Sequence, residues 1–161
     1  MAQVEVIRGD GGYAVVILLN NIIEYSYSKQ LANVTNNQME LQAILHAFKH
    51  IISKNPEEDF VIYCDSAYCV NICNDWIFTW AKNNWINSKK EEIKNVDLIK
   101  ELYSYLKIDF PNFKIEKIPG HSNILGNELA DALCSNNEAK FAKIKKENNI
   151  RDKYDFIIWK F

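Results

Sequence analysis

Long apolar runs are missing from this sequence, and no stretch approaches the roughly 20 apolar residues that a membrane-spanning helix needs. Residues 1–9 also lack the apolar core of a secretion signal. The four cysteines have neither the Cys-x-x-Cys spacing nor the accompanying histidines of a zinc site. We therefore expect a protein of the cytoplasm or another intracellular compartment, without a membrane partner and with free thiols.

Positive charge is not in excess either, because 19 lysines and arginines stand against 21 aspartates and glutamates, for a formal net charge of −2. The protein as a whole would not be drawn to nucleic acid, and any such contact must come from local lysine clusters. Repeats and glycine- or serine-rich linkers are absent too. The length of 161 residues fits one domain with a full apolar core.

Hydrophobic patterning predicts an α/β fold. Residues 4–7, 13–19 and 23–27 have the apolar runs or the alternation of strands, with turn residues between them, which favours a three-stranded antiparallel meander. A helix follows. Thr35 can cap it, Gln38 completes a capping-box pattern, and the apolar residues after them recur at helical spacing.

The apolar run at residues 60–64 suits a central strand that is buried on both faces. Helices are expected at residues 66–74, from Asn95 onward and, with interruptions, over residues 127–147, and an ambiguous strand at residues 113–118. This order predicts a mixed sheet of five strands, three antiparallel and then two parallel, flanked by helices.

Three carboxylates stand where the pattern allows two interpretations. Glu40 lies at the edge of the apolar stripe of its helix, where it could simply complement the helix dipole. Asp65 follows the central strand, where ligand sites of α/β sheets form, or it could cap the next helix. Asp131, on the last helix, could be a solvated residue. A convergent set would require hard divalent cations, because packed carboxylates repel one another. Spacing alone does not show that they converge.

Four segments resemble, in the same order, motifs of the type 1 ribonuclease H family. Residues 35–41 (TNNQMEL) resemble its TNNxMEL segment, residues 65–70 (DSAYCV) its DSxYV, and residues 94–98 (KNVDL) its KNxDL. Residues 120–131 are similar to its GH…GNExAD motif. The matches extend over residues 4–133, and four motifs in family order make a chance match improbable.

The resemblance implies the ribonuclease H-like fold and an endonuclease that hydrolyses the RNA strand of RNA–DNA hybrids, leaving 5′-phosphate and 3′-hydroxyl ends. It implies that Glu40, Asp65 and Asp131 ligate two Mg²⁺ or Mn²⁺ ions, which would activate a water and stabilise the leaving oxygen. His121 would assist proton transfer or product release, since an imidazole titrates near neutrality, or it is a loop histidine without a task.

The resemblance also implies two places that bind the hybrid. At the helix start, amide side chains and backbone N–H groups can donate to phosphates, riboses and base edges, although Thr35 could be only a cap. In a basic protrusion within residues 76–94, lysines would meet phosphates and tryptophans would pack on sugars or bases, although Trp80 could be a core anchor. The candidate residues are Thr35, Asn36, Asn37, Gln38, Ser66, Trp80, Lys82, Trp85, Lys89 and Lys90.

The first strand departs from the family pattern. The family has an aspartate near the end of this strand and then a glycine-rich loop, and most of that loop is missing here. Asp10 could be the fourth metal ligand, or Asp10 and Gly11 could form a tight hairpin turn; Glu5 is a second candidate. Because the family's loop contacts RNA 2′-hydroxyls, its loss predicts weaker hybrid binding or altered specificity.

An alternative of another class is a catalytically impaired hybrid-binding module with the same fold, its first metal ligand lost. A DNA nuclease or resolvase is disfavoured by the TNNQMEL and GNELAD segments together. We expect residues 1–137 to form the ribonuclease H domain and to act as a monomer. Residues 138–161 form a basic and aromatic extension. Its lysines either contact nucleic acid or face solvent, and its aromatic end either docks on the domain or forms a dimer contact.

Overall fold

One mixed sheet forms the centre of the molecule. The computed structural model describes residues 2–9, 12–53, 60–107, 113–118 and 125–153. Six strands pair in the order β5-β4-β1-β2-β3-β6. The antiparallel meander appears as predicted, as β1 (Ala2–Gly9), β2 (Gly12–Leu19) and β3 (Ile22–Gln30). The two parallel strands also appear as predicted: β4 (Phe60–Cys64) lies beside β1, and β5 (Phe113–Lys117) lies beside β4.

The sixth strand was not predicted, so the expectation of a five-stranded sheet is wrong. β6 (Arg151–Asp152) pairs in parallel with the outer edge of β3. The Arg151 backbone N–H donates to the Asn21 carbonyl at 3.0 Å, and the Lys153 N–H donates to the Ile23 carbonyl at 2.9 Å. Two residues in a polar stretch are too few to show the alternation of a strand, which explains why the pattern did not reveal it.

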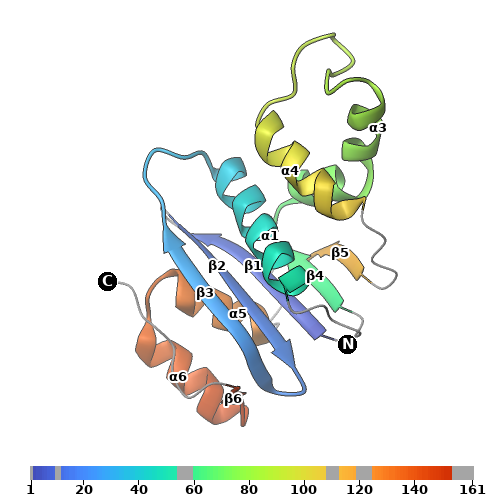
Figure 1. Cartoon of the computed structure of the whole chain (residues 1–161). Coiled ribbons are helices and arrows are strands. Elements are labelled where there is room, and N and C mark those ends of the chain that lie inside the picture. The colour runs from blue at the N-terminus through green and yellow to red at the C-terminus, as the bar shows by residue number, and fades with distance from the viewer. Residues whose placement is uncertain (1, 10–11, 54–59, 108–112, 119–124, 154–161) are drawn as a thin grey trace.

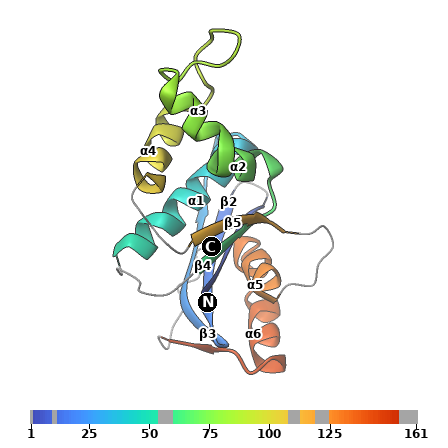
Figure 2. The same cartoon turned by 90° about the vertical axis from the view of Figure 1, so that its right-hand side faces the viewer.

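Helices cover both faces of this sheet (Figures 1 and 2). On one face lies α1 (Asn36–Ser53), and on the other lie α5 (Leu125–Cys134) and α6 (Glu138–Glu147). Alternate residues of β2 supply the two cores: Val15 packs with α1, and Val16 packs with α5 and α6. A strand covered on both faces must be apolar throughout, which is why residues 13–18 are all buried.

A helical protrusion follows β4 and stands at the top of Figure 1. The predicted helix at residues 66–74 is longer than expected, because α2 (Ala67–Asn71), a π-helical segment (Ile72–Trp76) and α3 (Ile77–Lys82) continue one another. α4 (Val96–Leu106) then packs back against α1 and α3. The buried side chains of Ile72, Cys73 and Ile77 join this protrusion to the core under α1.

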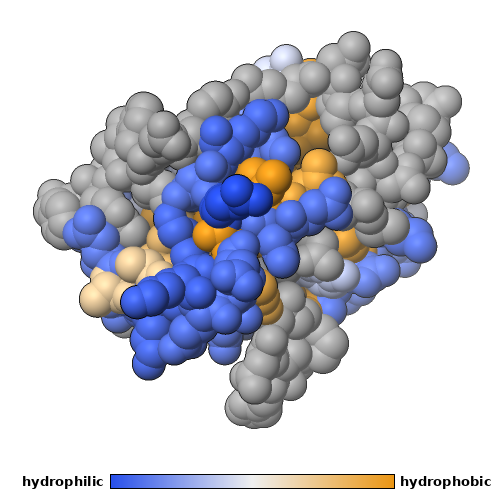
Figure 3. All heavy atoms as spheres, turned by 90° about the horizontal axis from the view of Figure 1, so that it is seen from below, coloured by the Kyte–Doolittle hydropathy of each residue, from blue (hydrophilic) through white to orange (hydrophobic). Residues whose placement is uncertain are grey.

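The exposed apolar side chains gather on the protrusion. In the described residues, the large apolar side chains that remain exposed are Trp76, Phe78 and Ile86. At the opposite end, seen from below in Figure 3, the described residues are mainly hydrophilic, with small apolar areas between polar side chains. Among the described helices, none is both long and apolar enough to cross a membrane.

Candidate active site

Asp65 lies where the carboxyl ends of parallel strands meet. Cys64, the last residue of β4, pairs in parallel with Val6 of β1 and with Lys117 of β5. The Ile118 N–H donates to the Cys64 carbonyl at 3.0 Å and keeps β5 beside β4 up to this point. The exposed Asp65 follows immediately. It lies at the carboxyl ends of the strands, where α/β folds bind ligands.

Ser66, and not Asp65, caps the next helix. Its backbone is extended, and its hydroxyl accepts a hydrogen bond from the Cys69 N–H at 3.2 Å. The alternative in which Asp65 serves as the cap is therefore wrong. Because the cap is filled by its neighbour, the Asp65 carboxylate remains available for another task.

Glu40, on α1, contacts the first turn of the same helix that Ser66 caps. It lies in the second turn of α1 and is half-buried, and the Cys69 thiol donates to its Oε2 at 3.7 Å. Hydrogen bonding to Cys64 and then burial raise the pKa of the Cys69 thiol, so it stays protonated and can donate. Cys69 thus contacts the Glu40 carboxylate through its thiol and the Ser66 hydroxyl through its N–H. Glu40 is thereby tied to the helical turn that directly follows Asp65.

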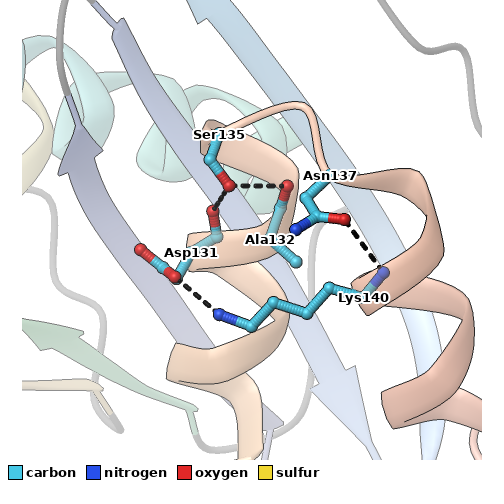
Figure 4. A network of polar contacts seen from close by, with 5 residues as sticks. All are labelled: Asp131, Ala132, Ser135, Asn137 and Lys140. Carbon is cyan, nitrogen blue, oxygen red and sulfur yellow. Dashed lines mark hydrogen bonds and ion pairs between the residues drawn. The ribbon is translucent and has the colours of Figure 1, made fainter.

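Asp131 lies on α5, which covers the face of the sheet opposite to that of Glu40. Its Oδ2 accepts a charged hydrogen bond from Lys140 Nζ at 2.8 Å (Figure 4). The hydroxyl of Ser135 donates to the Asp131 carbonyl at 2.8 Å, so the end of the helix is fixed as well. The Asp131 side chain is 54% exposed, but it has an ion-pair partner and is not merely solvated.

The three carboxylates thus come from α1, from the end of β4 and from α5. Within the described ranges, no three side chains of His, Cys, Asp or Glu are grouped closely enough to hold one metal ion. Two further predicted residues, Asp10 and His121, lie outside those ranges. The donors still fit a hard divalent cation in kind, because all are carboxylate oxygens and Asp131 already attracts a cationic group.

The start of α1 forms the capping box that the sequence predicts. The Gln38 N–H donates to Thr35 Oγ1 at 3.2 Å, and the Thr35 N–H donates to Gln38 Oε1 at 2.9 Å. Both side chains are occupied by the cap. Asn36 and Asn37 between them are exposed, so the helix start presents two amide side chains to solvent.

The protrusion contains a groove of about 730 Å³. Its lining includes Trp76, Trp80, Lys82 and Ile86. Trp80 has both predicted characters, because it packs against the core and also faces the groove, with its ring 5.9 Å from that of Trp76. Trp85 packs edge-on against Tyr103 at 5.4 Å. Lys89 and Lys90 are exposed beyond it.

Two contacts of the predicted ligands were not foreseen from the sequence. Cys69 belongs to the quoted DSAYCV segment, but nothing in its spacing says that its thiol meets Glu40. Lys140 is separated from Asp131 by the break between α5 and α6, at Ser135–Asn137. A helical pattern cannot show how two helices turn at such a break, and therefore no sequence signal pointed to this pair.

Comparison with known proteins gives the family. A family model described as RNase H matches residues 4–139. A ribonuclease H of Caldicellulosiruptor saccharolyticus is 41% identical over 127 residues, which cover 78% of this chain and 83% of that protein. A ribonuclease H of Orientia tsutsugamushi is 34% identical over 146 residues, covering 91% and 83%. The chain belongs to the ribonuclease H family.

Solved structures agree on the fold. The PFV RNase H domain superimposes with a TM-score of 0.68 at 22% identity, over 83% of this chain and 90% of that one. LC11-RNase H1, solved in complex with an RNA/DNA hybrid, gives 0.56 at 18% identity, over 81% and 91%. The ribonuclease H-like α/β fold is confirmed. With the curated relatives, so is the predicted activity: the chain is a hydrolase, an endonuclease for the RNA strand of RNA–DNA hybrids. The family depends on divalent metal ions.

Proposed function

We propose that hydrolysis takes place at a site formed by Glu40, Asp65 and Asp131, with Asp10 as the fourth carboxylate. The metal would be Mg²⁺ or Mn²⁺, with two ions per site. The observation that carries this proposal is the position of Asp65 at the carboxyl ends of the parallel strands β4 and β5, with Glu40 tied to the same turn through Cys69. Glu40 and Asp131 belong to helices on opposite faces of the sheet, and Asp65, at the carboxyl end of β4, lies between those faces.

Each side chain has a role in this proposal. Bound ions would polarise the phosphodiester and make water a better nucleophile. The carboxylates would bind the positively charged ions, and the neutral thiol of Cys69 positions Glu40 without adding charge. His121 gives a proton to the leaving O3′ or helps the product to depart, which leaves 3′-hydroxyl and 5′-phosphate ends.

We also propose how the hybrid binds. Asn36 and Asn37 donate to one strand at the start of α1, supported by the backbone N–H groups of the helix, Thr35, Gln38 and Ser66. The protrusion binds the DNA strand through its groove and its lysines, with Trp80, Lys82, Trp85, Lys89 and Lys90. Residues 1–137 act as a monomeric catalytic domain, and residues 138–161 extend it.

The test is a gel assay of a labelled RNA–DNA hybrid with Mg²⁺ and with Mn²⁺, comparing the wild type with Asp65→Asn. Metal-ion catalysis supplies several kcal/mol, so loss of a ligand should slow cleavage by at least about 100-fold. Equal cleavage by the two proteins would refute the site. An Asp10→Asn variant that stays fully active would show that Asp10 is not a ligand.

The alternative of a hybrid-binding module with impaired catalysis is disfavoured by the family match and the curated relatives, but the shortened connection after β1 on which it rested is present. The pairing of β1 and β2 continues to Gly9 and Gly12, so only two residues connect these strands and the family's glycine-rich loop has no room. Gly12 is required there, since a Cβ would lie 2.6 Å from the Lys29 carbonyl oxygen.

A further inference from the structure

We propose that Lys140 is the internal counter-ion of Asp131 and sets the divalent-cation concentration at which this carboxylate can take a metal ion. The ammonium group competes with a metal ion for Asp131 Oδ2, and its positive charge disfavours a second cation on this carboxylate. Lys140 is in this sense a positioning residue for the reaction. The inference rests on the proposed role of Asp131 as a metal ligand.

The position of Lys140 is fixed by the turn between α5 and α6 (Figure 4). The Asn137 N–H donates to the Ala132 carbonyl at 2.8 Å, which folds the chain back after α5. The Asn137 side chain then caps α6 by accepting from the Lys140 N–H at 3.1 Å. This places Lys140 in the first turn of α6, with its side chain directed back at Asp131.

A lysine in the first turn of a helix opposes the helix dipole, which favours negative charge at that end. The carboxylate of Asp131 offsets this cost at a distance of 2.8 Å. Two other lysines of α6 have partners in the C-terminal segment itself, because Lys143 pairs with Glu147 and Lys145 with Asp152. The ion pair of Lys140 instead reaches a predicted catalytic carboxylate. Lys140 also follows the last residue, 139, that the family model matches.

The strength of the pair decides what it can do. The side chains of Lys140 and Asp131 are 41% and 54% exposed, so water and salt screen their attraction and the pair is weak. A divalent ion with twice the charge can displace the ammonium. Lys140 therefore raises the metal concentration that is required but does not block the site. Removal of a pair of this kind should strengthen metal binding by about two- to fivefold.

The experiment measures Mn²⁺ binding to the full chain without nucleic acid, from the electron paramagnetic resonance signal of free Mn²⁺ at fixed ionic strength. Lys140→Met removes the charge and keeps an aliphatic stem. Lys143→Met is the matched control, since it changes the net charge equally on the same helix. Lys140→Arg keeps the charge. Asp131→Asn and its double variant with Lys140→Met complete the set, and circular dichroism checks that each variant is folded.

We expect Lys140→Met to bind Mn²⁺ about two- to fivefold more tightly than both the wild type and Lys143→Met, and the gain to vanish in the Asp131→Asn background. Lys140→Arg should bind as the wild type does. If Lys140→Met matches Lys143→Met, or if its gain survives in the Asp131→Asn background, the inference is wrong. If Asp131→Asn alone leaves Mn²⁺ binding unchanged, the proposed ligand set itself is wrong at Asp131.

Discussion

At the residue scale, Cys69 shows how a buried neutral group can serve a charged one. Its thiol is fully buried, it donates to Glu40, and its own N–H is held by Ser66. A lysine at this position would also hold the carboxylate, but it would compete with a metal ion for the same oxygen. A thiol that stays protonated orients Glu40 and leaves its charge available.

Replacement of Cys69 by alanine should therefore weaken the use of metal by the enzyme, while Cys69→Ser, which keeps a donor, should retain it. A hydrogen bond to a charged group contributes about 1.5 kcal/mol or more, and a thiol is a weaker donor, so we expect a three- to tenfold higher Mg²⁺ concentration at half-maximal cleavage. The measurement is the cleavage rate against Mg²⁺ concentration. Equal values for the alanine and serine variants would mean that the thiol only fills space.

At the element scale, the start of α1 combines a stabilising cap with a surface for the hybrid. The reciprocal hydrogen bonds of Thr35 and Gln38 are local, and so the sequence predicts them from a spacing of three residues. The directions of the four side chains divide the capping role from the hybrid-binding role. Side chains that turn inward to cap the helix are occupied, whereas Asn36 and Asn37 face solvent.

Two substitutions separate these tasks. Thr35→Ala removes the cap acceptor and should lower the free energy of unfolding by about 1 kcal/mol. Asn36→Ala should change it by less than about 0.5 kcal/mol but weaken hybrid binding, because it removes an exposed amide. Urea denaturation and hybrid titration of both variants provide the measurements. Stability lost in Asn36→Ala, with binding intact, would contradict the assignment of the surface role.

At the scale of the whole molecule, the parts that the sequence predicts are those whose signals are local or periodic. The strand residues 13–18, the α1 stripe and Asp65 at a strand end are of this kind, and the fold class follows from them. The family follows from the four segments that resemble its motifs. The contacts that complete the picture join distant elements: β6 on β3, Cys69 on Glu40 and Lys140 on Asp131. Such contacts depend on how helices and strands far apart in the chain turn and pack together, which residue spacing does not encode.

The central claim is that carboxylates from both faces of the sheet meet around divalent ions at the end of β4. The most direct measurement is anomalous diffraction from a crystal of this chain containing Mn²⁺. The account predicts manganese peaks in contact with the carboxylate oxygens of Glu40, Asp65 and Asp131, with Lys140 moved away from Asp131. Manganese bound away from these three side chains, with the Lys140–Asp131 pair intact, would contradict it.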